Sequence, residues 1–188
     1  MTDDRLKDAE IMARVAAGDQ GACRHLVDRH LGPVIGLAVR LLGDRAAAED
    51  VAQEAFLRLW RQSRTWRPDA RLGTWLYRVA YNLCMDQLRT RRRLSPEGVP
   101  ELADPADGPA QRHQRAQVAL RVEGAIARLP ERQRAAITLV HHQELSNIEA
   151  AAVMDVSIEA IESLLSRDRR ALRRELASDK QDLLGEVK

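Results

Sequence analysis

The hydrophobic positions of this chain recur at helical spacing, and the first half of the sequence divides into four such segments. Val51, Ala55 and Leu59 recur every four residues, which places them on one face of a helix. Asp19 is a good N-cap for the second segment, and Pro33 predicts a kink or short break within it. The predicted helices cover about 8–17, 20–42, 44–64 and 72–94.

The second half of the chain also predicts four helices. Pro130 suits the first position of one helix, and Ser146 with Glu149 forms the capping-box pattern that starts the next. Ser157 is a good N-cap for the last one. These helices cover about 112–128, 130–143, 146–154 and 157–176. Because no run of alternating β-branched residues occurs, the sequence predicts an all-α fold.

A proline-rich, acidic stretch separates the two halves. Four of the seven prolines stand at 96, 100, 105 and 109, and the stretch has no hydrophobic period that would continue a helix. We expect a flexible linker over 95–111 that joins two small helical domains. The expected divisions are 1–94 for the first domain, 112–177 for the second and 178–188 for a tail.

Composition narrows the class of protein. The net charge of the 188 residues is only +2, so any nucleic-acid surface must be local, and Arg is concentrated in 89–93 and 167–174. Cys23 and Cys84 match no zinc-binding spacing, which predicts reduced thiols and no metal site. The N-terminus is too polar for a signal peptide, and no apolar run is long enough to insert in a membrane. We therefore expect a cytoplasmic protein.

The aromatic residues are confined to one part of the chain. All six lie within 26 positions, from Phe56 to Tyr81, with arginines interleaved among them. Rings stack on unpaired bases, at about 1–3 kcal/mol per base, and arginines neutralise phosphates. The alternative is that the rings form the core of one small helical domain, and some of them must have that role.

The C-terminal segment has the spacing of a helix-turn-helix. Ala151 is small where two helices would cross, Asp155 occupies the turn, and Ile161 would pack the second helix back onto the first. Leu165 and Leu172 continue the buried stripe of that helix. The alternative is a helical hairpin whose arginine-rich face is merely solvated, but the combined pattern favours DNA binding.

Three stretches of this chain resemble a known family when they are taken in order. They are DRAAAEDVAQEAFLRLWRQ, TWRPDARLGTWLYRVAYNLCMDQLR and LPERQRAAITLVHHQELSNIEAAAVMDVS. They are similar to the extracytoplasmic-function (ECF) sigma factors, the smallest class of the sigma-70 family, over about residues 10–175. The resemblance implies an initiation subunit of bacterial RNA polymerase with no cofactor, held by an anti-sigma factor.

The resemblance also implies roles for individual residues. The third helix would bind the core polymerase through Asp50, Gln53 and Glu54. The −10 promoter element would be read and melted by Trp66, Arg67, Arg71, Trp75, Arg78, Tyr81 and Asn82. The −35 element would be contacted by Ser157, Glu159, Glu162, Ser163, Ser166, Arg167 and Arg170.

The chain departs from the family pattern at several of these positions. Asp155 stands where the family usually has Gly in the turn, and Asp tolerates a left-handed backbone better than most residues. Glu162 and Leu164 stand where the family often has basic residues, which predicts an unusual −35 preference. Tyr81 replaces an Arg that often precedes the Asn of the fourth helix.

Other classes of protein fit the sequence less well. A helix-turn-helix regulator that works outside the polymerase would need a sensing pocket or metal set in its N-terminal domain, and we find neither. For an enzyme, the adjacent His141 and His142 point about 100° apart on a helix, and no phosphate loop or nucleophile motif occurs. An anti-sigma or adaptor protein would not need arginine tracts at both DNA-reading positions.

Overall fold

The computed structural model describes residues 3–94 and 121–185, with side chains over 6–94 and 121–174. Every regular element in these ranges is helical, as the sequence predicted. The N-terminal domain consists of α1 (Asp3–Ala16), α2 (Gln20–Leu42), α3 (Arg45–Gln62), the short 3₁₀ helix η1 (Ser63–Thr65) and α4 (Leu72–Leu94). The predicted linker, 95–111, lies outside the described residues.

Local capping residues set the ends of the N-terminal helices. The Asp19 carboxylate accepts hydrogen bonds from Gly21 N and Ala22 N, and Asp44 accepts one from Ala47 N, so α2 and α3 begin where predicted. Helix α2 ends at Gly43, which has the left-handed φ of 68°. It runs through Pro33 without a break, and α1 begins five residues earlier than predicted.

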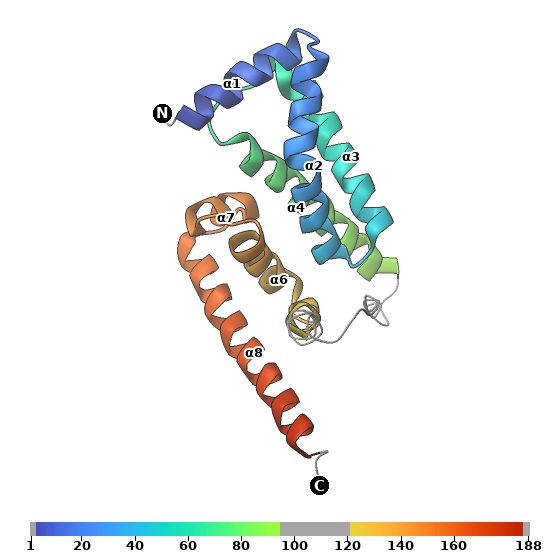
Figure 1. Cartoon of the computed structure of the whole chain (residues 1–188), viewed down its shortest axis with the longest axis vertical. Coiled ribbons are helices and arrows are strands. Elements are labelled where there is room, and N and C mark those ends of the chain that lie inside the picture. Colours follow the sequence, from blue (N-terminus) through green and yellow to red (C-terminus); the bar gives the residue numbers. More distant parts are fainter. Residues whose placement is uncertain (1–2, 95–120, 186–188) are drawn as a thin grey trace.

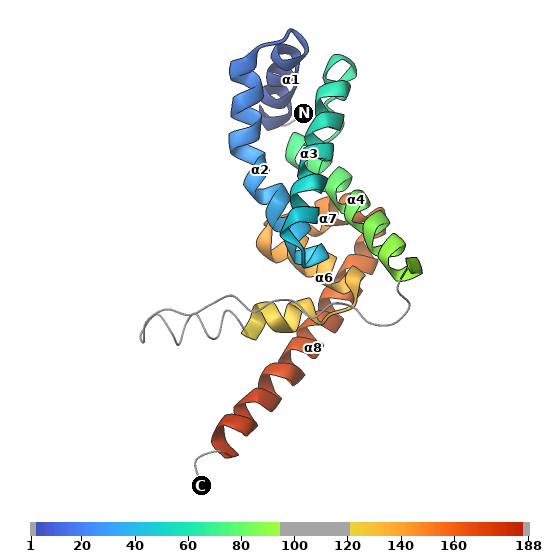
Figure 2. The same ribbon diagram turned by 90° about the vertical axis from the view of Figure 1, so that its right-hand side faces the viewer.

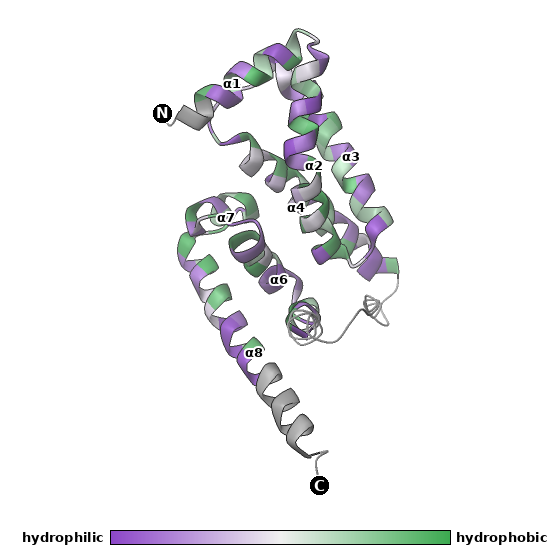
Figure 3. Ribbon diagram, in the orientation of Figure 1, coloured by the Kyte–Doolittle hydropathy of each residue, from purple (hydrophilic) through white to green (hydrophobic). Residues whose placement is uncertain are grey.

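The start of α4 is capped from a distance. Asp8 on α1 accepts a hydrogen bond from Leu72 N at 2.8 Å, so a side chain from the first helix satisfies a backbone donor of the fourth. Helices α2, α3 and α4 pack around a core that includes Leu37, Leu59 and Leu76, none of them exposed. Figure 3 shows hydrophobic and polar residues alternating along these helices, as amphipathic packing requires.

The C-terminal domain follows the predicted order with two differences. Residues 121–127 are helical, and α6 (Glu131–Ile137) continues into the π-helix η2 (Thr138–His142). Helix α7 (Asn147–Met154) and helix α8 (Ile158–Gly185) follow. Pro130 is the N-cap of α6 instead of its first residue, and α8 continues nine residues past the predicted end at 176.

The two domains lie against each other. Helix α7 packs on α4, and α6 packs on α2, while α8 projects away from the body of the molecule toward the C-terminus (Figures 1 and 2). The domains therefore share an interface that local sequence patterns did not predict.

Asp168 is an exception to the apolar packing of α8. Its side chain is 0% exposed, and neither carboxylate oxygen has a hydrogen-bond partner among the described residues. Burial raises the pKa of Asp168 from 3.8 to about 7, because the charged carboxylate loses its hydration. Since the folded-state pKa lies above the unfolded value, the native state loses stability as the pH rises from about 4 to 7.

We therefore expect Asp168→Ala to stabilise the protein more at pH 8 than at pH 5. The difference between the two gains should be about 2–3 kcal/mol, since one pKa unit corresponds to about 1.4 kcal/mol. Urea unfolding at both pH values measures it. Asp86→Ala, which removes an exposed carboxylate from α4, is the matched control and should show no such difference. Equal gains for Asp168→Ala at both pH values would contradict this account.

Candidate nucleic-acid interface

The outer side of α3 presents a polar face with one apolar residue in it. Asp50 and Gln53 are exposed, and Glu54 lies beside them one helical turn from Asp50. Arg58 donates to Glu54 Oε1 at 2.7 Å, and this hydrogen bond holds the pKa of Glu54 below its usual value. Leu57, 39% exposed, extends the same face. The structure thus brings the three predicted polymerase-contact residues together on a surface suited to a basic and partly apolar partner.

The loop before α4 and the outer side of α4 hold the predicted −10 residues. Arg67, Arg71, Arg78 and Asn82 are exposed. Trp66 and Trp75 pack edge to face, with ring centroids 5.8 Å apart. Both tryptophans are half-buried against the core.

The aromatic residues serve the core more than the sequence suggested. Phe56 is buried, and Tyr81 is only 6% exposed, so the Tyr81 ring is not presented to DNA in this arrangement. Burial raises the pKa of the Tyr81 phenol, and Arg132 of the C-terminal domain lies close enough to hydrogen-bond to it. The indole Nε1 of Trp66 is buried without a hydrogen-bond partner among the described residues. Clustering of the rings in the sequence therefore reflects packing first.

The helix-turn-helix forms as predicted. Ser146 and Glu149 complete the capping box of α7. Asp155 has φ 54°, so it takes the left-handed turn position usually held by glycine. Ser157 accepts a hydrogen bond from Ala160 N and so caps α8. The small Ala151 is buried where α7 and α8 cross, as this motif requires.

Helix α8 turns one side to the core and the other to solvent. Ile161 and Leu165 are buried, and the residues on the opposite side are exposed. Successive residues of a helix are rotated by about 100°, so the side chains that point directly away from Ile161 and Leu165 form one line along α8. This outward line consists of Glu159, Ser163, Ser166 and Arg170. Ser157, Glu162 and Arg167 are exposed beside this line. Such a helix can enter the major groove by its N-terminal half.

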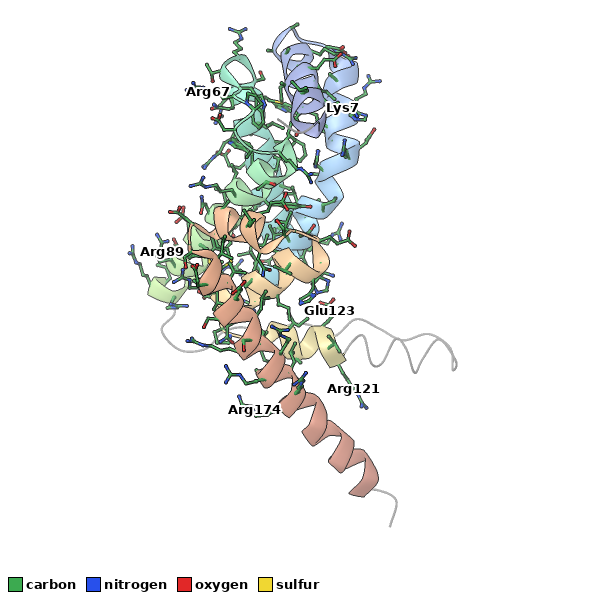
Figure 4. The ribbon with its side chains drawn as sticks, turned by 90° about the vertical axis from the view of Figure 1, so that its left-hand side faces the viewer. Lys7, Arg67, Arg89, Arg121, Glu123 and Arg174 are labelled. Atoms are coloured by element: carbon green, nitrogen blue, oxygen red, sulfur yellow. The ribbon has the colours of Figure 1, made fainter. Side chains whose placement is uncertain are left out.

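Charge along α8 changes from acidic to basic. Glu159 and Glu162 lie in the first two turns, whereas Arg167, Arg170 and Arg174 follow on the exposed side. Figure 4 shows Arg174 on the projecting part of α8 and Arg67 at the opposite end of the molecule. Basic groups suited to phosphate contacts are thus present on both domains.

The C-terminal domain covers part of the surface that the sequence predicts for −10 binding. Arg71 Nη1 lies 3.8 Å from a Glu149 carboxylate oxygen, and Arg78 Nη2 lies 3.7 Å from Asp155 Oδ1. Both carboxylates belong to the helix-turn-helix. Two of the arginines expected to hold promoter DNA are therefore paired with acidic residues of the other domain.

Two residues at the interface between the domains, Arg134 and Gln143, were not identified from the sequence. Arg134 of α6 is 7% exposed and donates to Ala127 O at 2.7 Å and to Leu41 O of α2 at 2.9 Å. Gln143 accepts a hydrogen bond from the Tyr77 hydroxyl at 2.8 Å. Neither contact follows from local periodicity, since the partners are 66 to 93 residues apart.

Among the described residues, no group of three or more His, Cys, Asp or Glu side chains is arranged to hold a metal ion. His142 lies 3.6 Å from Glu123, and burial lowers the pKa of this imidazole. Among these residues, no helix is long and apolar enough to cross a membrane.

Two family models match the chain, and full-length relatives align with it. Sigma-70 region 2 matches residues 26–94, and Sigma-70 region 4 matches residues 119–172. The RNA polymerase sigma-H factor of Pseudomonas aeruginosa is 33% identical over 178 residues, which cover 88% of this chain and 92% of that protein. This chain belongs to the ECF sigma factors of the sigma-70 family. The ECF sigma factor SigW of Bacillus subtilis is 30% identical over 174 residues, covering 87% and 93% of the two chains.

Solved sigma-factor complexes have the same fold. CnrH, solved in complex with the cytosolic domain of CnrY, superimposes with a TM-score of 0.67 at 28% identity, over 94% of this chain and 98% of CnrH. The sigma factor RpoE of Bartonella quintana, solved with the anti-sigma factor NepR, gives a TM-score of 0.68 at 26% identity. That alignment covers 83% of this sigma factor and 97% of RpoE.

Glu162 is exposed on α8, so it can be replaced without disturbing the core, and its predicted role at the −35 element can be tested. A carboxylate can accept a hydrogen bond from the amino group of cytosine, so we expect Glu162 to select a C in the −35 element. Glu162→Gln should then change base preference at one position by about 1–3 kcal/mol. Binding to a randomised −35 library measures this. Asp28→Asn on α2 is the control for the change in charge. A uniform rise in affinity for all sequences would indicate repulsion instead and contradict direct readout.

Proposed function

We propose that this chain is the subunit that directs core RNA polymerase to a set of promoters and starts transcription there. The observation that carries this proposal is the presence, in one chain, of a region 2 match and a region 4 match. A regulator that acts outside the polymerase would need only the helix-turn-helix. The exposed α3 face of Asp50, Gln53, Glu54 and Leu57 would then have no purpose.

Each domain would contribute a different contact. The α3 face binds the core enzyme, the surface formed by the loop before α4 and by α4 itself captures the −10 element, and the outward line of α8 lies in the major groove at −35. Arginines on both domains neutralise phosphates, which makes promoter binding sensitive to salt. The chain itself catalyses no reaction in this proposal, and it acts in the cytoplasm, where its polymerase is.

Promoter binding requires the two domains to separate. The −10 and −35 elements are named for their positions upstream of the transcription start, so their centres lie roughly 25 base pairs apart. At 3.4 Å per base pair, this spacing is about 85 Å along B-DNA. In the structure, Arg78 of α4 lies only 3.7 Å from Asp155 of the helix-turn-helix. The closed arrangement therefore cannot bind both elements at once.

An anti-sigma factor is the expected regulator. The solved proteins that this chain resembles, CnrH and RpoE, were each captured with a partner, and NepR is named as an anti-sigma factor. A partner that clamps the two domains together would keep the −10 arginines paired with Glu149 and Asp155. Such a partner inhibits by preventing the separation that promoter binding requires.

Reversing two charges on α3 tests the polymerase contact. Asp50→Lys with Glu54→Lys should weaken binding to purified core polymerase by about 100-fold or more, because like charges brought together cost several kcal/mol. Run-off transcription should fall in parallel. The loss of the exposed Glu54–Arg58 pair should cost at most about 1 kcal/mol of folding stability.

Glu10→Lys with Asp28→Lys is the matched control, since it adds the same charge at exposed positions of α1 and α2. Native-like core binding by the α3 variant, or an equal loss in the control, would show that the α3 face is not the contact.

A further inference from the structure

The loop Trp66–Arg71, which joins η1 to α4, is flanked at both ends by contacts with α1. Helix α1 packs against η1 (Ser63–Thr65), the element directly before the loop. At the other end, Leu72 N of α4 donates to Asp8 Oδ2 of α1 at 2.8 Å. The first helix of the chain therefore contacts the elements that precede and follow this loop (Figure 1).

Helix α4 cannot cap its own first turn through its N-cap side chain. Arg71 O accepts a hydrogen bond from Trp75 N at 3.0 Å, which makes Arg71 the N-cap residue. Helices prefer Ser, Thr, Asp or Asn at this position, because the side-chain oxygen accepts a hydrogen bond from the first turn. A guanidinium carries donors only, so Arg71 cannot do this. Asp8, on another helix, supplies the missing acceptor.

The surroundings of Asp8 favour this contact. A carboxylate at a helix N-terminus is stabilised by the helix dipole. A Cβ atom on Gly73 would lie 3.5 Å from His30 Cε1, so the imidazole of α2 packs beside the same turn of α4. Burial, and then the charge of Arg29, lower the pKa of His30 to about 4, so this ring is neutral at neutral pH. A neutral His30 offers Asp8 no ion pair that would compete with Leu72 N.

Helix α1 is itself fixed to the rest of the domain. Met12 and Val15 of α1 are buried in the core. Near the end of α1, Arg14 Nε donates at 2.9 Å to Asp19 Oδ2, and Asp19 is the residue that caps α2. A helix anchored by both apolar packing and a hydrogen bond is a firm support for Asp8.

The capped turn carries side chains that we assign to the −10 element. Arg71 is its N-cap residue, and Trp75 lies in the first turn of α4. Trp66, at the other end of the loop, packs edge to face on Trp75, with ring centroids 5.8 Å apart. A movement of this turn would therefore move Arg71 and Trp75 directly and would disturb Trp66 through its ring contact.

We propose that Asp8 is a positioning residue for −10 recognition. By capping α4 from α1, Asp8 fixes the loop Trp66–Arg71 in one arrangement before DNA binds, without contacting DNA itself. The match to Sigma-70 region 2 begins at residue 26, so α1 lies outside it. The assignment of the loop to the −10 element rests on the proposed function. A loop that is fixed in only some molecules binds more weakly, because apparent affinity falls with the fraction in the binding-competent state.

Removal of the cap tests the proposal in the holoenzyme assembled with core polymerase. Asp8→Ala leaves Leu72 N without its acceptor, and loss of a helix cap shifts an equilibrium by about fivefold. Promoter opening should therefore fall by about fivefold. Permanganate reactivity of −10 thymines measures it, on a promoter selected by run-off transcription from genomic fragments. Affinity for core polymerase should stay within about twofold of the native value, since the α3 face does not include Asp8.

Two matched variants separate the hydrogen bond from the loss of charge. Asp8→Asn keeps an oxygen acceptor and should open the promoter within about twofold of the native chain. Glu10→Ala removes an exposed carboxylate from the same helix and should also stay within about twofold. Native opening by Asp8→Ala, or an equal loss in Glu10→Ala, would overturn the proposal. A parallel loss of core binding in Asp8→Ala would overturn it as well, because Asp8 would then only stabilise the domain.

Hydrogen–deuterium exchange tests the anchor without DNA or polymerase. In Asp8→Ala, the Leu72 amide and the amides of the loop Trp66–Arg71 should exchange about fivefold faster than in the native chain, while amides of α3 keep their native rates. Native exchange at Leu72 would contradict the anchoring role. A uniform increase over α3 and α4 would contradict it too, since the whole domain would then have lost stability.

Run-off transcription separates this proposal from the proposed function. If the native chain initiates from no genomic fragment, the sigma-factor role fails, and faster exchange at Leu72 in Asp8→Ala would still support Asp8 as the anchor of the loop. If the native chain initiates and Asp8→Ala opens promoters equally well, the positioning role fails alone.

Discussion

The closed arrangement depends on Arg134, a buried cation that hydrogen-bonds to the backbone of both domains. Two of its donors, Nη1 and Nη2, find backbone acceptors, which offsets much of the cost of burying a charge, whereas Nε has no hydrogen-bond partner among the described residues. One of its acceptors, Leu41 O, lies in the last turn of α2, where the helix supplies no donor of its own. The C-terminal domain thus completes a helix of the N-terminal domain. The same interface includes the contact of α7 with α4 and the pairing of Arg78 with Asp155.

An ECF sigma factor binds both core polymerase and promoter DNA, and the contact between the two domains affects the surfaces proposed for these partners differently. The α3 face around Asp50 is exposed when the two domains are in contact, whereas the surface of α4 that we propose for the −10 element is partly covered by α7. Under the proposed assignment of sites, polymerase binding and promoter binding can therefore occur in sequence. Polymerase binding would use a surface that is already exposed, and promoter binding would require the interface that contains Arg134 and Gln143 to open.

Sequence alone predicts the features that depend on near neighbours. Asp19 and Ser146 mark helix starts because each caps backbone groups within three residues, and Asp155 takes its turn because Asp tolerates a positive φ. Features that join distant parts of the chain are not predicted. Tyr81 is predicted from the sequence to read the −10 element, yet it is buried, with Arg132 of the C-terminal domain beside its hydroxyl. The hydrogen bond from Tyr77 to Gln143 spans 66 residues and belongs to no helical period.

The distance between the two domains tests the account most directly. Dyes at Asp28→Cys on α2 and Arg169→Cys on α8, both exposed positions, would report it by single-molecule energy transfer after Cys23 and Cys84 are replaced by Ala. The account predicts a short distance in the free chain and a separation larger by tens of ångströms in the open promoter complex, because the two promoter elements lie about 85 Å apart on DNA. A transcribing complex that keeps the distance of the free chain would contradict it.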